Sequence, residues 1–427
     1  MFPSHLIDPR KKNKDWIQQF ARAAWHTWYN NGYKRDHFRM LDDYAQGRQS
    51  IEQYKPVMGV DEQGESWTEL DFTVLPVIPK LLTQAKSRLN KAGYNIVATA
   101  IDPLAQKELQ DYFKELEAKI KIKAEIEKIM PGFSEYTPAG KTKVGEAQDL
   151  EELELQKNYT YQHQATIEIE QALEVVFNHN NFWETRKISK EDTLVYGVGG
   201  VKEYIDSNGS IRIRKVNPWG IVSSFCRKRD FSDAEYLGEI IELTIGELKQ
   251  WAQDQFTEEE YKQIAETCCN KYGNPDILPA NNAMSYGYDS FKIEVVDMEF
   301  FSVNEDYFER GVNNYGNAVI SRAPYGSKST NSREFLRTSY KVVYKCCYIV
   351  HSDKIFNYGL CTDMKRVKSQ LNDTSMSFHF YAPSMRNMRI VSKVEEVIPL
   401  ADQVQIAWLK LQQAIAEARP KGIMIEF

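Results

Sequence analysis

Apolar residues recur at three- and four-residue steps near the C-terminal end of the chain, which is the spacing of one face of an α-helix. Pro399 suits a first helical turn, where its missing N–H needs no partner, and Pro420 with Gly422 is typical of a helix end. The pattern therefore predicts a helix over residues 397–418, with an apolar stripe formed by Val397, Leu400, Ala401, Val404, Trp408, Leu411, Ile415 and Ala418.

The rest of this predicted helix mixes amides with few charges, and Ile406 and Leu409 add a second apolar edge. Two interpretations follow: an ordinary core helix, or a helix packed against its own copies around a central channel. In both, Trp408 is expected to be buried. The second assigns Val404, Trp408, Leu411 and Ile415 to the subunit interface or core of a stem, and the channel wall to Gln405, Lys410, Gln412 and Gln413.

The N-terminal half has mainly the period of helices. The pattern predicts helices over residues 14–29, 37–46, 80–92, 103–130 and 150–178, a strand over 94–100 and a mobile loop over 133–148. Trp16, Trp25 and Trp28 share one face of the first helix, where they are expected in the core or at a subunit interface; base stacking is the alternative.

From Asp192 onward the apolar pattern changes to the period of strands. Thr244 with Glu247, and Thr257 with Glu260, have the spacing of capping boxes and predict two helix starts. The predicted strands cover 201–205, 211–216, 220–225, 237–243 and 291–301, and a hairpin joins 340–350 to 354–358. Residues 313–330 are expected to be mobile and 362–390 irregular. The chain therefore belongs to the α+β class.

Composition narrows the range of functions. The 427 residues are 42% hydrophobic and 12% aromatic, which suits a chain with a large core and much interface. The formal net charge is −6, whereas a protein that grips nucleic acid is normally basic, since phosphate neutralisation drives that binding. If DNA is involved, it is expected to pass by weakly held.

Motifs for catalysis, metals and targeting are missing from the sequence. The six cysteines include two adjacent pairs and no CxxC, so we interpret them as reduced thiols in a cytosolic compartment. The glycines of residues 197–200 do not form a GxGxxG or P-loop motif. There is no signal peptide and no run long enough to span a membrane. We predict no catalytic residue, metal site or cofactor, and hence no enzyme.

Several longer stretches resemble the portal proteins of tailed bacteriophages, in particular the crAss-like group. They are Thr193-Leu-Val-Tyr-Gly-Val-Gly-Gly-Val-Lys, Val216-Asn-Pro-Trp-Gly-Ile-Val, Arg229-Asp-Phe-Ser-Asp-Ala-Glu-Tyr-Leu-Gly-Glu, Leu243-Thr-Ile-Gly-Glu-Leu-Lys, Ile349-Val-His-Ser-Asp-Lys-Ile-Phe-Asn-Tyr-Gly and the C-terminal helix. The resemblance is spread over residues 190–425. Another oligomeric virion component, such as a tail connector, and a nucleic-acid-processing enzyme remain the alternatives.

The resemblance implies a ring of twelve subunits at one capsid vertex of the virion, assembled in the host cytoplasm. Double-stranded DNA would pass through the ring, which would contact the major capsid protein, the terminase motor and a tail adaptor. Residues 1–240 would form the wing, 241–289 the first stem helix region, 290–392 the clip, and 393–427 the second stem helix with the start of a wing return. The crown of the family is missing, so the natural chain is expected to continue beyond Phe427.

The hairpin over 340–358 would belong to the clip. Its aromatic strand carries Tyr344 and Tyr348. These side chains either lie in the core or belong to a clip surface that docks the motor and later the adaptor, with neighbouring subunits joined edge to edge through their sheets.

Overall fold

The computed structural model describes residues 2–30, 33–59, 70–91, 96–98, 103–129, 164–206, 208–269, 292–312, 318–328, 334–362, 364–366 and 373–418. It is of the α+β class, as predicted. The chain divides into two compact units. One consists of Met1–Lys91 with Glu184–Phe427, and the other is Ala92–Trp183.

The larger unit contains a six-stranded sheet in which all neighbouring strands are antiparallel. The order is β3-β4-β5-β7-β8, with β6 paired to the outer part of β5. The bounds are β3 Ile221–Ser223, β4 Tyr236–Leu243, β5 Ile293–Val312, β6 Ala318–Ala323, β7 Glu334–Ile349 and β8 Lys354–Leu360. The expected boundaries at residues 240 and 289 therefore divide a single sheet.

A second, smaller sheet has the order β11-β1-β2, formed by β1 Gly199–Ile205, β2 Ile211–Lys215 and β11 Phe378–Tyr381. Two short antiparallel pairs follow the same region of the chain: β9 Lys365–Arg366 with β10 Thr374–Ser375, and β12 Met385–Arg386 with β13 Arg389–Ile390. The prediction that 362–390 is irregular was wrong for β9 to β13. Of these strands, β11 pairs with the distant strand β1, which no local pattern indicates.

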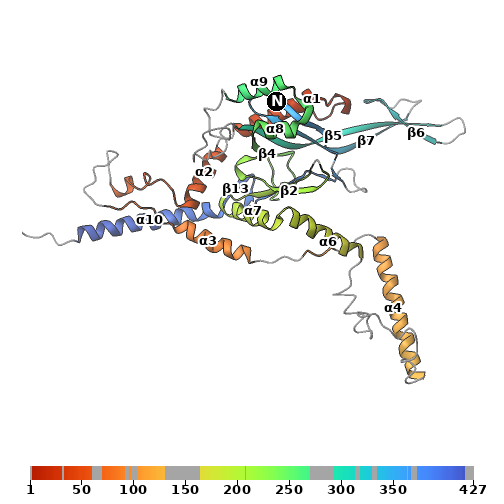
Figure 1. Cartoon of the computed structure of the whole chain (residues 1–427), viewed down its shortest axis with the longest axis horizontal. Coiled ribbons are helices and arrows are strands. Elements are labelled where there is room, and N and C mark those ends of the chain that lie inside the picture. Colours follow the sequence, from red (N-terminus) through yellow and green to blue (C-terminus); the bar gives the residue numbers. More distant parts are fainter. Residues whose placement is uncertain are drawn as a thin grey trace, which may run out of the picture. The chain divides into compact units, whose positions relative to one another are not determined.

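The predicted long hairpin between β7 and β8 is confirmed, but β5 is longer than expected. β5 and β7 pair from Val295–Ile349 to Arg310–Glu334, which extends the pair well past the strands β4 and β8. β6 lies inside the segment 313–330 that was expected to be mobile, so that prediction was wrong for residues 318–323. Figure 1 shows β5, β7 and β6 running out together as an arm.

Helix α1 (Lys14–Tyr29) covers one face of the large sheet. Asn13 caps it by accepting a hydrogen bond from the backbone N–H of Trp16. Trp16, Trp25 and Trp28 are buried with Phe20, whose ring stacks on Phe300 at 3.9 Å between centroids. The tryptophan stripe therefore lies in the core, one of the two predicted places. Figure 1 shows α1 above β4, β5 and β7, and β2 below them.

The three glycines within residues 197–200 allow neighbouring elements to pack closely in this fold. Gly197 has φ +78°, which favours glycine, and a Cβ on Gly199 would collide with Ser189 in α7 (Phe182–Tyr196). A Cβ on Gly200 would collide with the ring of Phe380 in β11. Helix α7 extends across residues 192–196, where a strand pattern had been predicted to begin.

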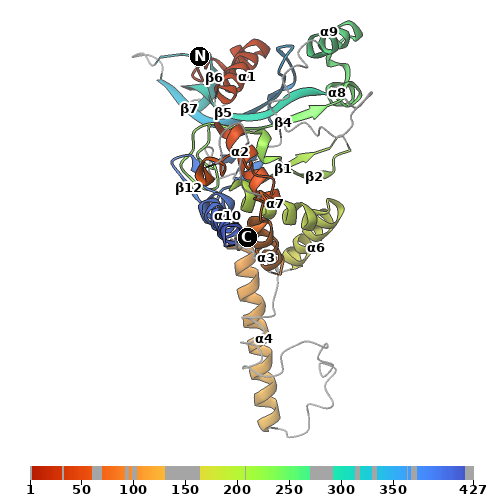
Figure 2. The same ribbon diagram turned by 90° about the vertical axis from the view of Figure 1, so that its left-hand side faces the viewer.

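Helices α2 (Tyr33–Gln46) and α3 (Val77–Asn90) pack beside α10 (Lys393–Glu417), as Figures 1 and 2 show. α10 starts earlier than predicted, because Ser392 caps it by accepting from the backbone N–H of Glu395. Pro399 is therefore an interior residue of the helix and not part of its first turn.

Helices α8 (Ile245–Ala252) and α9 (Glu258–Cys269) begin at the two predicted capping boxes. The hydroxyl oxygens of Thr244 and Thr257 accept from the N–H groups of Glu247 and Glu260, whose carboxylates accept in return from the threonine N–H groups. Both helices pack on the large sheet through a cluster that includes Leu248 and Ile264. They had been expected to supply a stem helix; in this fold they cover the sheet, whereas α10 lies on α2 and α3.

The smaller unit contains α4 (Pro103–Ile129) and α6 (Gln164–His179), which lie within the predicted helices 103–130 and 150–178 apart from the last residue of α6. Residues 96–98, the described part of the predicted strand 94–100, are not a strand. The backbone N–H of Ala98 donates to Glu170 at 2.6 Å instead. The predicted loop 133–148 lies outside the described residues.

Candidate functional site

Helix α10 has one face enclosed by the rest of its unit. Val394, Ala401, Gln405 and Leu409 are buried, and Leu409 is 0% exposed. The neighbours on this face are α2, α3 and the short 3-10 helix η2 (Pro56–Met58). This face anchors α10 and leaves the other faces of the helix available for other contacts.

Asp402 accepts two side-chain hydrogen bonds on the enclosed face. One carboxylate oxygen accepts hydrogen bonds from the phenol groups of Tyr44 at 2.9 Å and Tyr54 at 2.6 Å. Burial, together with the Asp402 carboxylate, raises the pKa of both tyrosines, so each phenol keeps the proton that it donates. The register of α10 against α2 and η2 is thereby set by charge-assisted hydrogen bonds.

The glutamines of α10 hold an extended segment of the backbone. Gln405 accepts from the N–H of Leu75 at 2.8 Å and donates to the carbonyl oxygen of Thr73 at 3.0 Å. Gln412 accepts from the N–H of Asp71 at 3.0 Å. The predicted channel-facing role of Gln405 was wrong for this fold, because its side chain is enclosed and only 2% exposed. Of the other residues in that prediction, Gln413 is half-buried and Lys410 is exposed.

We expect Gln405→Ala to lower the free energy of unfolding by about 1–3 kcal/mol, because the N–H of Leu75 and the carbonyl of Thr73 lose their partner. Chemical denaturation monitored by circular dichroism measures the change. Gln403→Ala is the matched control, since Gln403 is exposed on the same helix and should change stability by no more than about 0.5 kcal/mol. Equal losses for the two variants would contradict the role assigned to Gln405.

A neighbouring face of α10, about 100° around the helix from the enclosed face, carries an apolar stripe open to solvent, which we call the α10 stripe. It consists of Leu400, Val404, Trp408, Leu411 and Ile415, of which Trp408 is 41% and Ile415 60% exposed. The prediction of a buried Trp408 in a stem core was wrong for the single chain, because the enclosed face of α10 is formed by other residues. The interface interpretation of Val404, Trp408, Leu411 and Ile415 stays a prediction.

Tyr344 and Tyr348 on β7 lie in the core beneath α1. Tyr344 packs against Trp16 at 5.5 Å and against Phe300 at 5.8 Å between ring centroids. The phenol of Tyr348 donates to Asp353 at 2.9 Å. Both side chains are buried, so they do not form the docking surface of a clip, and the core alternative describes them correctly.

A buried network of charges joins the two sheets, and sequence reasoning did not identify it. Lys202 of β1 donates to Asp297 of β5 at 2.6 Å, and Arg214 of β2 donates to the same carboxylate oxygen at 3.0 Å. Arg214 also pairs with Glu239 of β4, which accepts from the backbone N–H of Asn217 at 3.0 Å. The signal was a carboxylate flanked by apolar residues in a predicted strand, as in Val295-Val296-Asp297-Met298, since buried charges require partners.

The carboxylates of this network respond differently to their surroundings. Burial alone would raise the pKa of Asp297, but the charges of Lys202 and Arg214 outweigh it and lower that pKa. For Glu239 burial prevails over the single cation Arg214, and its pKa is raised. Asp297 is therefore the charged carboxylate of the network, and both Lys202 and Arg214 contact it.

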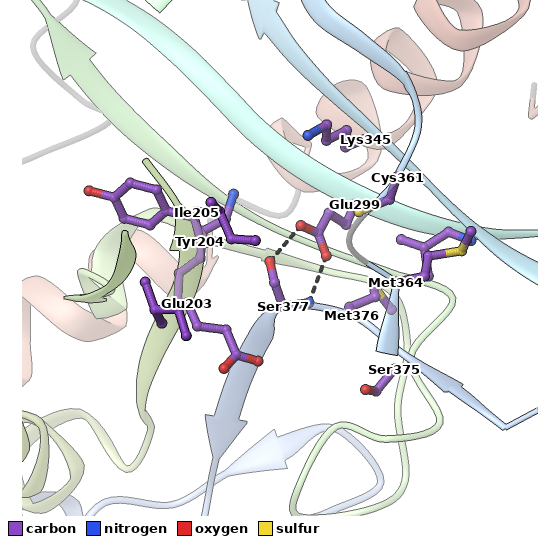
Figure 3. A pocket seen from close by; sticks show the side chains of 13 residues that line it. Glu203, Tyr204, Ile205, Glu299, Lys345, Cys361, Met364, Ser375, Met376 and Ser377 are labelled. Atoms are coloured by element: carbon purple, nitrogen blue, oxygen red, sulfur yellow. Dashed lines mark hydrogen bonds between the residues drawn. The ribbon is translucent and has the colours of Figure 1, made fainter. Parts of the chain in front are cut away.

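A cavity of about 240 Å³ lies beside the network, between the two sheets. Figure 3 shows Glu299 turned toward Ser377, whose N–H and hydroxyl donate to the two carboxylate oxygens at 2.7 and 2.5 Å. Lys202, which also lines the cavity, forms an ion pair with Asp297. Glu299 and Lys202, two of the four charged residues that line the cavity, thus make contacts within the fold, and we assign the cavity to the fold.

Among the residues that the structure describes, no group of three or more His, Cys, Asp or Glu side chains could hold a metal ion. None of the described helices is long and apolar enough to cross a membrane.

Comparison with known proteins adds no relative. The chain matches no protein-family model and no curated protein.

Proposed function

We propose that the protein is a portal-type subunit that assembles into a closed ring and conducts double-stranded DNA. The observation that carries the proposal is the α10 stripe, an exposed apolar surface on a helix that its own unit anchors along a neighbouring face. Exposed apolar surfaces of this kind mark interaction sites.

The spacing of the α10 stripe supports a helix as the surface that covers it. Val404, Trp408, Leu411 and Ile415 are separated by four, three and four residues, which is the alternation by which packed helices interlock. The exposed tryptophan is a residue type that is enriched among the dominant contacts of interfaces. In a ring the contact is heterologous, so the stripe of one subunit would pack against a different face of the next.

The arm formed by β5, β6 and β7 supplies a second surface for neighbours. β8 pairs with β7 only from Tyr344 to Ile349, so within the described residues no strand pairs with the outer side of the 334–340 segment. Leu336 in this segment and Ile320 in β6 are exposed. A sheet edge beside which no described strand is paired can accept a strand from another chain, and we assign this edge to contacts between subunits.

The charge of the chain suits a channel through which DNA moves. A formal net charge of −6 limits binding to phosphates, whereas tight binding would stop transit. As in the family that the sequence resembles, we propose twelve copies, a terminase motor and a tail adaptor as partners, and a capsid vertex of the virion as the location.

Negative-stain electron microscopy of the purified chain tests this proposal. We expect rings with a central hole wide enough for a DNA duplex, with one rotational order. Rings of a different mass and rotational order would favour another virion component, such as a tail connector, and single particles of monomer size would contradict the proposed function.

A further inference from the structure

A cavity of about 520 Å³ opens where the N-terminal end of α10 meets α2, β3 and the β12–β13 hairpin. Its wall is mainly apolar, and among its polar groups His37 and Glu395 lie 3.3 Å apart. The hydroxyl oxygen of Ser223 is buried and has no hydrogen-bond partner among the described residues. The apolar wall includes Phe38, Val198, Pro218, Ile221, Phe231 and Ile390.

The backbone around this cavity is held in an uncommon conformation. Phe231, Asn387 and Met388 line the cavity and have φ values of 57°, 50° and 63°. Asn387 and Met388 form the two-residue turn of the β12–β13 hairpin, where a positive φ at both positions favours Asn-Gly. A methionine in place of that glycine costs conformational energy, and its side chain forms part of the cavity wall.

Two basic segments adjoin residues that line the cavity, and we call their five cations the basic rim. Arg389 lines the cavity, Arg386 faces Arg389 across the β12–β13 hairpin, and residues 227–229 shortly precede Phe231 in the chain. The five cations are exposed, and none of them forms an ion pair with a described residue: Arg227, Lys228, Arg229, Arg386 and Arg389. The two segments of the rim are joined by a hydrogen bond from the N–H of Ala382 to the carbonyl of Arg229 at 2.9 Å. Asp233 accepts from the backbone N–H groups of Arg227 and Lys228, which orders the loop that carries them.

An apolar cavity beside unpaired cations is complementary to an acidic peptide with an aromatic anchor. A DNA duplex has phosphates for the rim but no group that fills the cavity. An indole ring suits the apolar wall of the cavity. Its N–H can donate a hydrogen bond to the hydroxyl oxygen of Ser223.

We propose that the cavity and its basic rim bind residues 60–69 of a second copy of the chain. This segment reads Val-Asp-Glu-Gln-Gly-Glu-Ser-Trp-Thr-Glu, with four carboxylates around the single aromatic residue Trp67. It lies outside the described residues, so only its sequence and its length enter the inference. The inference rests on the proposed ring and names a second contact between neighbouring copies.

The length of the chain favours a second copy over the same copy. Asp71 is held at Gln412, and Trp67 is four residues away, which allows at most about 14 Å. Gln412 and Glu395 are seventeen residues apart along α10, or about 26 Å. The backbone from Asp71 to Trp67 therefore covers only about half of that distance, which favours the cavity of a second copy.

Calorimetric titration of a synthetic peptide with the sequence of residues 60–69 tests the inference. The protein is the full chain carrying Trp408→Asp, which we expect to be monomeric, so that peptide binding is measured independently of the ring. We expect saturable one-to-one binding that weakens with added salt. Arg389→Glu in the protein, or alanine in place of Trp67 in the peptide, should weaken binding at least tenfold, and the control Arg88→Glu, an exposed cation on α3, should not.

Met388→Gly provides an independent readout, because it relieves the positive φ while removing part of the cavity wall. We expect peptide binding to weaken at least fivefold with the melting temperature unchanged or raised. Absence of peptide binding, or binding that Arg389→Glu leaves unchanged, would overturn the inference. So would a DNA duplex that binds the rim in place of the peptide. Rings that form normally while the peptide fails to bind would reject this contact and leave the proposed function standing.

Discussion

Replacing Asp297 by alanine is expected to lower the free energy of unfolding by about 3–5 kcal/mol, because the substitution leaves Lys202 buried without its carboxylate. The melting temperature should fall by about 6–15 °C. Arg214 keeps Glu239 as a partner, so the loss is concentrated on Lys202. Differential scanning calorimetry of the monomeric Trp408→Asp background measures the effect without a contribution from assembly.

Two further variants serve as controls for this prediction. Asp306→Ala removes a carboxylate that pairs with the largely exposed Arg322 on the arm, and should cost less than about 1 kcal/mol. The double variant Lys202→Met with Asp297→Leu removes both charges and should recover at least half of the loss. If Asp297→Ala cost no more than Asp306→Ala, the buried network would not hold the sheets together.

Trp408→Asp is expected to abolish the ring at micromolar concentration while the fold of the single chain remains. Trp408 is 41% exposed, so an aspartate there is hydrated in the monomer, whereas in the ring it would be buried against a neighbour without a partner. Size-exclusion chromatography with light scattering gives the mass, and circular dichroism gives the fold.

The matched control is Lys410→Asp, which places the same residue on the same helix outside the α10 stripe. Lys410 is exposed, and we expect this variant to assemble like the unchanged chain. A ring that survives Trp408→Asp, or one that Lys410→Asp disrupts equally, would show that the α10 stripe is not the contact.

The parts of the fold that were predictable from sequence depend on local interactions. The tryptophan face of α1 follows helical spacing, and the starts of α8 and α9 follow from Thr244 and Thr257, whose partners are three residues away. The start of α10 was missed because the cap at Ser392 had to be weighed against Pro399, which the helix accommodates as an interior residue.

The features that sequence reasoning missed depend on residues far apart in the chain. The pairing of β1 with β11 and the ion pair between Lys202 and Asp297 join residues about one hundred or more positions apart, which no local pattern specifies. Gln405 illustrates the same limit. An amide on a helix suggested a channel wall, yet its partners are backbone groups of Thr73 and Leu75.

Native mass spectrometry of the unmodified chain at micromolar concentration tests the central claim most directly. A ring stabilised through the α10 stripe predicts one dominant species, with a mass close to twelve times that of the 49.6 kDa chain. A spectrum that contains only the 49.6 kDa monomer would contradict the proposed assembly.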